Sequence, residues 1–213
     1  MTPMRTSTRP RGMATATVAA LGAGTAIVLT LLAASSQPTG WEFRSFRTIN
    51  ELPDWLNLLL WPLMQYGALA AIPVVAAAVW WRGRPRLAAS LGLAALGGYL
   101  FAKLVKEAVG RGRPGDYLDG VIEREAFGEG SLGYPSGHAV VAATLTTALA
   151  PVVPRPLRFG LVVLTLAVLL GRVYVGGHLA VDVIGGGAIG VALGAVASLI
   201  VDRDKEQNGA GHG

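Results

Sequence analysis

Residues 171–182 read GRVYVGGHLAVD and lie between two long apolar runs of the 213-residue chain. They include Arg172, His178 and Asp182, side chains that membrane-spanning segments rarely carry without a function. If the chain is helical from His178 onward, His178 and Asp182 share one helix face, because residues four apart are neighbours. The carboxylate can then hold one imidazole nitrogen and leave the other free as a base or nucleophile. Taken alone, the stretch is explained equally well by a salt bridge between helices beside a structural histidine.

The composition is that of an integral membrane protein. Hydrophobic residues make up 52% of the chain and charged residues 15%, and the mean hydropathy is +0.50. Apolar runs of about 20 residues recur, which is the length that crosses the hydrocarbon core of a bilayer. We therefore expect an all-α integral membrane protein with six transmembrane helices in one bundle. The predicted spans are residues 14–34, 55–81, 87–105, 136–153, 157–175 and 178–201.

The segments outside these spans are more polar. Residues 1–13 are expected to be a disordered basic N-terminus, and residues 202–213, which include His212, a solvated polar tail. The first apolar segment ends in small residues, as a cleavable signal peptide does, but its long apolar core favours a first span. In 41–54, apolar residues recur every three positions, which suits either a short helix in the membrane interface or a plain loop.

The distribution of basic residues predicts the orientation. An even number of spans puts both termini on one side, where ten Lys and Arg residues fall against eight on the other. Three of the eight, Lys106, Arg113 and Arg172, form a cluster with a chemical explanation of its own, which leaves ten against five. The positive-inside rule then makes the termini cytoplasmic in the cell membrane. The net charge of +5 is ascribed to topology and anionic membrane lipids, so no nucleic-acid partner is expected.

Three motifs fall at the same membrane face. Lys106 and Arg113-Pro114 close the third predicted span, PSGH at 135–138 opens the fourth, and 172–182 connects the fifth to the sixth. Because successive spans alternate in direction, all three motifs lie on the extracytoplasmic side. This convergence follows from the order of the spans alone.

Each motif has a chemical interpretation and an ordinary one. Lys106 and Arg113 would bind an anion, or would only snorkel to the headgroup layer. Ser136 at a helix start would cap it and leave the amides of Gly137 and His138 free for an anion, although capping needs no ligand. Cations, free amides, two histidines and an acid together describe a phosphate site. The histidines lack zinc-ligand spacing and the chain has no cysteine, so no metal or cofactor is expected.

In this order, Lys-x6-Arg-Pro, Pro-Ser-Gly-His and Arg-x5-His-x3-Asp resemble the three signature motifs of the type-2 phosphatidic acid phosphatase superfamily. The resemblance covers residues 87–201, and the residues before them match only as a pattern of spans. It implies a six-span lipid phosphate phosphatase. One departure is Gly171, where the family commonly has a serine, and the missing hydroxyl would remove one contact to phosphate.

The resemblance also implies a role for each motif residue. His178 is then the nucleophile that forms a phosphohistidine, Asp182 orients it, and His138 acts as general acid and afterwards as general base. No metal is required, because fixed cations stabilise the phosphoryl charge. Two histidines in opposite protonation states imply a bell-shaped pH–rate profile. The implied phosphate-binding residues are Lys106, Arg113, Ser136, Gly137 and Arg172.

The expected substrate is a phosphate on a lipid anchor, because a site at the membrane surface selects for one. The family's substrates include phosphatidic acid, phosphatidylglycerophosphate, polyprenyl diphosphates and prenyl-linked sugar phosphates, and all four stay open. Two other functions also stay open: a phosphotransferase that uses the same phosphohistidine, and a non-catalytic lipid-binding protein. Six spans disfavour a soluble haloperoxidase of the same superfamily, and charges at span ends disfavour a transporter.

Two further features carry expectations. Gly186, Gly190 and Gly194 recur every four residues, which indicates close helix packing, either within the chain or in a homo-oligomer. The acidic loop at 115–134 would either cover the site and repel bulky anionic headgroups or, as we favour, be only a solvated loop.

Overall fold

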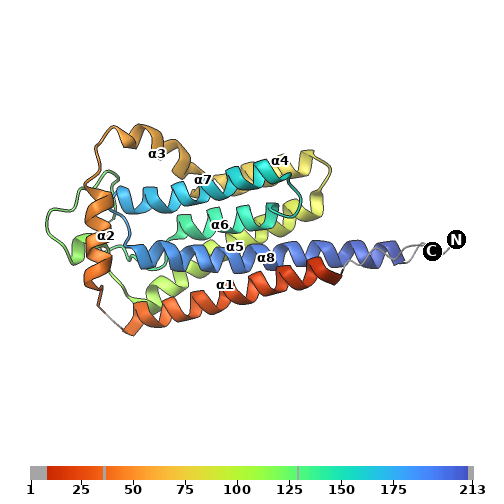
Figure 1. Ribbon diagram of the computed structural model, residues 1–213, viewed down its shortest axis with the longest axis horizontal. Coiled ribbons are helices and arrows are strands. Elements are labelled where there is room, and N and C mark those ends of the chain that lie inside the picture. The colour runs from red at the N-terminus through yellow and green to blue at the C-terminus, as the bar shows by residue number, and fades with distance from the viewer. Residues whose placement is uncertain (1–8, 36, 129, 211–213) are drawn as a thin grey trace.

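The computed structural model describes residues 9–35, 37–128 and 130–210, and within these ranges every regular element is helical. The long helices run side by side as a bundle, and one short helix lies across an end of it (Figure 1). The elements are α1 (Arg9–Ser35), α2 (Gly40–Asn50), α3 (Leu56–Met64), η1 (Gln65–Gly67), α4 (Ala71–Trp81), α5 (Pro85–Val109), η2 (Pro114–Asp116), α6 (Gly137–Leu149), α7 (Arg155–Tyr174) and α8 (Ala180–Ala210).

The described residues contain four helices that are long and apolar enough to cross a membrane. They lie at Gly12–Ala34, Pro85–Asp116, Arg155–Tyr174 and Ala180–Ile200. A fifth span is formed if α3 with η1 and α4, which are bent by 66°, count as one. The chain therefore has several helices able to cross a membrane, whereas the count of six spans stays a prediction.

The bend falls between the two prolines that interrupt the predicted second span, Pro62 and Pro73. It follows Gly67, where a Cβ would lie 2.7 Å from the carbonyl oxygen of His138. The chain thus turns where its backbone packs against the start of α6.

Helix α6 is the core of the bundle. It has 13 residues, so it is about 20 Å long and shorter than a hydrocarbon core. Ten of its residues are buried against neighbouring helices, chiefly α5, α7 and α8. A helix shielded from lipid by its neighbours does not need to match the thickness of the bilayer.

The glycine ladder of α8 packs against α6 within the chain. Cβ atoms at Gly186, Gly190 and Gly194 would lie 2.4–2.5 Å from carbonyl oxygens of α6 and its N-cap, so only glycine permits this approach. Of the two alternatives, close packing within the chain is the one that the structure shows for these glycines, because the backbone of α6 occupies that face. A homo-oligomer stays a prediction.

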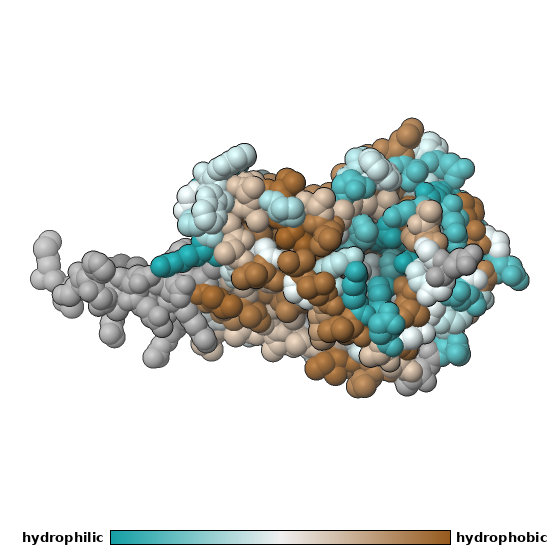
Figure 2. Space-filling model, turned by 180° about the vertical axis from the view of Figure 1, so that it is seen from behind, coloured by the Kyte–Doolittle hydropathy of each residue, from teal (hydrophilic) through white to brown (hydrophobic). Residues whose placement is uncertain are grey.

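Of the segment 41–54, residues 41–50 are helical as part of α2, which lies across one end of the bundle (Figure 1), and residues 51–54 are not helical. A position in the membrane interface stays a prediction. Glu42, Phe46 and Asn50, spaced four apart, are its buried residues. Figure 2 shows hydrophilic residues gathered over this end of the molecule and apolar residues over the flank of the bundle.

Helix α1 begins and α8 ends at the other end of the bundle (Figure 1). Both extend beyond the predicted spans, so residues 9–13 and 202–210 are helical where a disordered segment and a polar tail are predicted. The rest of the predicted disordered start, at 1–8, and His212 lie outside the described residues.

Candidate active site

The three motifs meet at the end of the bundle that carries α2. Lys106 lies in the last turn of α5 and Arg172 in the last turn of α7, whereas Ser136 is the N-cap of α6. His178 precedes α8, and Asp182 lies in its first turn. Helix ends from four parts of the sequence thus contribute to one site, as the alternation of spans predicts.

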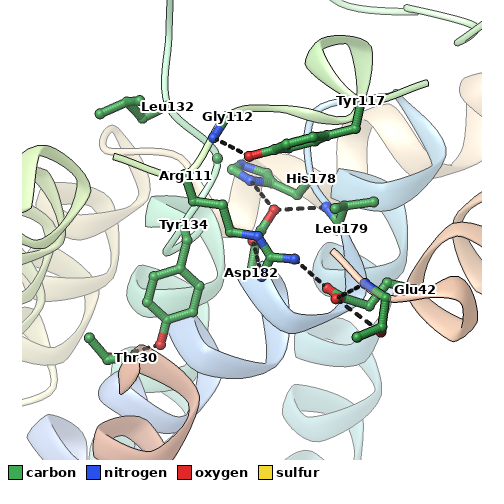
Figure 3. A network of polar contacts seen from close by, with 12 residues as sticks. Thr30, Glu42, Arg111, Gly112, Tyr117, Leu132, Tyr134, His178, Leu179 and Asp182 are labelled. Atoms are coloured by element: carbon green, nitrogen blue, oxygen red, sulfur yellow. Dashed lines mark hydrogen bonds and ion pairs between the residues drawn. The ribbon is translucent and has the colours of Figure 1, made fainter. Parts of the chain in front are cut away.

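His178 and Asp182 are adjacent and almost fully buried, with 3% and 0% of their surface exposed. The Nδ1 of His178 lies 3.8 Å from Oδ2 of Asp182. The same carboxylate oxygen accepts a hydrogen bond of 2.8 Å from the amide of Leu179, which fixes its orientation (Figure 3). Because Nδ1 faces the carboxylate, Nε2 is the ring nitrogen left for chemistry.

The surroundings keep His178 neutral. Burial, and after it the positive charges of Arg172, Lys106 and Arg113, lower the pKa of His178 well below its ordinary value. A neutral imidazole retains a lone pair on one nitrogen, which is what a nucleophile or base requires.

Lys106 and Arg113 are held by the backbone of the neighbouring connections. The Nζ of Lys106 donates to the carbonyls of Leu132 and Gly133 at 2.6 and 2.9 Å. Arg113 donates from Nη1 to the carbonyl of Gly177 at 2.7 Å and from Nε to a serine hydroxyl at 2.6 Å. Lys106 uses two of its three N–H donors in this way, so its position is fixed while one donor remains for a ligand.

Arg172 faces the acidic loop. It is 4% exposed, and its Nη1 forms an ion pair and hydrogen bond with Oε2 of Glu125. The ring of Phe127 lies between the two arginines of the site, 4.4 Å from the Arg113 guanidinium and 5.7 Å from that of Arg172. The expectation of a merely solvated loop is therefore wrong for this part, which covers the cations. Glu129 of the same loop lies outside the described residues.

Two residues that sequence reasoning missed hold the loop in place. The side chain of Asn50 donates to the carbonyls of Ile122 and Tyr174 and accepts from the amide of Ile122 at 2.9–3.0 Å. Arg124 donates to the carbonyls of Asn50 and Tyr174 at 2.7 and 2.9 Å. The sequence contains one signal for Asn50: it is a polar residue on the apolar face of α2, four positions after Phe46.

Ser136 occupies the N-cap of α6, but its side chain makes no capping hydrogen bond. The expectation that its hydroxyl caps the helix is wrong. Its Oγ is buried without a partner in the described part of the chain, and its amide donates to the carbonyl of Asp182 at 3.0 Å. The amides of Gly137 and His138 begin the helix and have no intrahelical acceptor, as in any first turn.

Gly171 packs against Met64 and Leu60 of α3. A Cβ at this position would lie 2.6 Å from Cγ of Met64 in α3, so a serine would collide there. Close packing of α7 against α3 thus gives a structural reason for the glycine, which is independent of any contact to phosphate.

A buried ion pair adjoins Asp182 and was not predicted. Arg111 and Glu42 are 5% and 3% exposed, and Nη2 of Arg111 donates to Oε1 of Glu42 at 2.7 Å. Two sequence features could have indicated this pair. Glu42 lies on the same helix face as Phe46, and Arg111 lies inside the first motif.

In the described ranges, no group of three His, Asp or Glu side chains is arranged to hold a metal ion. The charge available to a ligand is instead that of Lys106, Arg113 and Arg172. Fixed cations around a buried histidine suit an anionic, tetrahedral group such as a phosphate.

A bundle of apolar helices with a cationic, histidine-containing site at one end defines a class of helical membrane proteins that act on anionic groups. Residues 87–206, which are 120 of the 213 residues, match the family model of the PAP2 superfamily. The chain belongs to the PAP2 superfamily. It is a membrane phosphatase of this superfamily.

Two crystal structures have a similar fold. LpxE from Aquifex aeolicus is 21% identical with a TM-score of 0.68, and the match covers 75% of this chain and 95% of LpxE. A transmembrane PAP2 type phosphatidylglycerolphosphate phosphatase from Bacillus subtilis is 22% identical with a TM-score of 0.68. The match covers 86% of this chain and 96% of that phosphatase. No curated protein matches the chain.

Proposed function

We propose that this phosphatase works without a metal, through a phosphohistidine formed on His178, at the extracytoplasmic end of six membrane spans. The observation that supports this most directly is the buried pair of His178 and Asp182, with Nδ1 and Oδ2 3.8 Å apart beside three cations. An imidazole that is neutral, oriented and surrounded by phosphate-binding groups meets the requirements of a phosphoryl acceptor.

In the first step, Nε2 of His178 attacks phosphorus while the bond to the lipid oxygen breaks. His138 donates a proton to that oxygen, so the lipid leaves as an alcohol or, from a diphosphate, as the monophosphate. Asp182 accepts a hydrogen bond from the Nδ1–H of the imidazolium that forms. Lys106, Arg113 and Arg172 stabilise the charge on the phosphoryl oxygens.

In the second step, water attacks phosphorus and the bond to Nε2 breaks. His138, now neutral, takes a proton from this water, and inorganic phosphate leaves. Ser136 and the amide of Gly137 complete the set of donors, because the Ser136 hydroxyl is buried and has no partner among the described residues.

The proposed orientation rests on two observations. The polar end with α2 and the candidate site lies opposite the end where α1 begins and α8 ends (Figure 1). The positive-inside rule favours the cytoplasm for the termini, which assigns the site to the other face. The six-span count then requires α6 to act as a span, shortened because it is enclosed by other helices.

The proposed substrates are the phosphomonoesters and diphosphates of glycerolipids and polyprenols. The fold likeness to the phosphatidylglycerolphosphate phosphatase from Bacillus subtilis supports a glycerolipid as the first one to try. Glu125, which pairs with Arg172, is an internal carboxylate that a substrate phosphate would displace.

The test measures phosphate release from phosphatidic acid, phosphatidylglycerophosphate and a polyprenyl diphosphate in detergent with EDTA. Wild-type protein should release phosphate, and His178→Ala should not. Loss of activity in EDTA would contradict a metal-independent reaction, and equal rates in both proteins would remove His178 as the nucleophile. Transfer of labelled phosphate to an added alcohol instead of water would identify a phosphotransferase.

A further inference from the structure

The buried ion pair of Arg111 and Glu42 lies directly behind the proposed nucleophile. We propose that these two residues are positioning residues, in which Glu42 holds the Arg111 guanidinium and Arg111 holds the Asp182 carboxylate behind His178. The inference rests on the proposed roles of His178 and Asp182. It connects the catalytic pair to α2, a helix outside the family match.

The contacts form a continuous chain (Figure 3). Oε1 of Glu42 accepts from Nη2 of Arg111 at 2.7 Å, and Nη1 of Arg111 lies 3.6 Å from Oδ1 of Asp182. The other oxygen of Asp182 faces Nδ1 of His178 at 3.8 Å. Arg111 therefore contacts the oxygen of Asp182 that His178 does not use.

Glu42 is itself fixed by its own helix. Its Oε2 accepts from the amide of Thr39 at 3.0 Å and lies 3.3 Å from the hydroxyl of the same residue, which is the capping box of α2. Both oxygens of Glu42 thus have partners, and its position does not depend on Arg111 alone.

Burial makes this chain more than a surface ion pair. Asp182 is 0% exposed, and a carboxylate in such a place is neutralised unless a cation lies nearby. Oδ1 of Asp182, Nε of Arg111 and Nδ1 of His178 are buried without a hydrogen-bond partner in the described part of the chain. The 3.6 and 3.8 Å separations would shorten to hydrogen bonds when His178 becomes cationic on attacking phosphorus.

The rival interpretation is that Arg111 and Glu42 only tie α2 to the bundle. Stability alone cannot separate the two, because removing either partner leaves an uncompensated buried charge in the other. Removing both partners together reduces this cost, since apolar residues of similar volume often replace a buried pair. The remaining cost falls on Asp182, which loses the cation 3.6 Å from its Oδ1, so the readout that separates the two roles is kcat at unchanged KM.

The experiment compares Glu42→Leu/Arg111→Met with wild type, measuring unfolding midpoint, kcat and KM for one lipid phosphate in detergent. The positioning role predicts that the double variant unfolds at a higher temperature than Arg111→Met alone, keeps the wild-type KM, and loses kcat by about 10- to 100-fold, the range over which removing the partner of a metal-binding histidine lowers activity. Arg113→Gln is the contrasting variant. It removes a phosphate-binding cation, so it should raise KM.

Two conservative variants keep the test decisive if the double variant does not fold. Glu42→Gln preserves shape and should lower kcat at unchanged KM, and Arg111→Lys should retain more kcat than Arg111→Met because a cation remains. Wild-type kcat in a folded double variant, or in Glu42→Gln, would overturn the positioning role. A change in KM alone would overturn it as well. Wild-type and His178→Ala controls in the same assay show whether the proposed function itself has failed.

Discussion

The amide of Ser136 donates a hydrogen bond to the carbonyl oxygen of Asp182 at 3.0 Å. This contact joins the N-cap of α6 to the first turn of α8, and so links the motif that contains His138 to the motif that contains His178. Gly186, one turn beyond Asp182, allows the approach, because a Cβ there would lie 2.5 Å from the carbonyl of Ser136. Backbone contacts therefore hold the two histidine-bearing segments together, and a bound substrate would not displace them.

Gly186→Ala should lower both stability and activity. A methyl group would push the Ser136 backbone away from α8, and overpacking of this kind costs about 1–3 kcal/mol. Gly187→Ala is the matched control, because a Cβ there would meet only Cδ2 of Leu169 at an ordinary 3.6 Å. Thermal unfolding and phosphate release in detergent would measure both effects, and equal behaviour of the two variants would contradict the close approach.

Gly190, one turn after Gly186 in α8, gives a prediction about the oligomeric state. Gly190→Ala should lower the unfolding midpoint without changing the oligomeric state, because its Cβ would meet the carbonyl of Val140 at 2.4 Å within the same chain. Size-exclusion chromatography with light scattering would measure the state in detergent. Dissociation of an oligomer by this substitution, at an unchanged midpoint, would instead place the ladder between two copies.

The pH dependence should reflect the environment of His178. Because its pKa is lowered, the neutral form persists at pH values below the ordinary pKa of about 6.5, so the acid limb of kcat/KM falls only at more acidic pH. Arg172→Gln removes a cation that lowers the pKa of His178, and should move this limb toward higher pH.

The same substrate serves for both profiles, so its own ionisation is common to them. An acid limb that stays in place, or that moves to lower pH in Arg172→Gln, would contradict the electrostatic account of His178. A wild-type profile without an alkaline limb up to about pH 9 would contradict the role of His138 as general acid.

Glu125→Gln should lower KM several-fold. The Glu125 carboxylate pairs with Arg172, and its side chain is 42% exposed, so it competes with a phosphate yet is free to move away. Neutralising it leaves the arginine to the substrate. Steady-state kinetics on one lipid phosphate would measure this, with Glu123→Gln in the same loop as the control. A raised KM would mean that Glu125 orients Arg172 for substrate instead of competing with it.

The motif part of the site is predictable because its residues lie at helix ends, and alternating spans bring those ends to one face. The spacing of His178 and Asp182 also gives their adjacency directly. What spacing does not give is the position of α2, so the pairing of Glu42 with Arg111, 69 residues away, has only a weak signal. An acid four residues before Phe46, on the buried face, is that signal.

Two features of the fold depend on tertiary packing and were beyond a reading of hydropathy. Helix α6 is apolar enough to be taken for a span, but its burial among other helices allows it to be short. The contact of Phe127 with Arg113 depends on how Asn50 and Arg124 anchor the loop, and loop composition alone suggests only a solvated segment.

In the proposed mechanism, His178 carries the phosphoryl group during turnover. The most direct measurement is rapid acid-free quenching of the enzyme with a ³²P-labelled aryl phosphate, whose leaving group needs no proton from His138. We expect alkali-stable, acid-labile label on wild-type protein, more of it on His138→Ala because hydrolysis then lacks its base, and none on His178→Ala. Phosphate release by wild type without any covalent label, or undiminished label on His178→Ala, would contradict it.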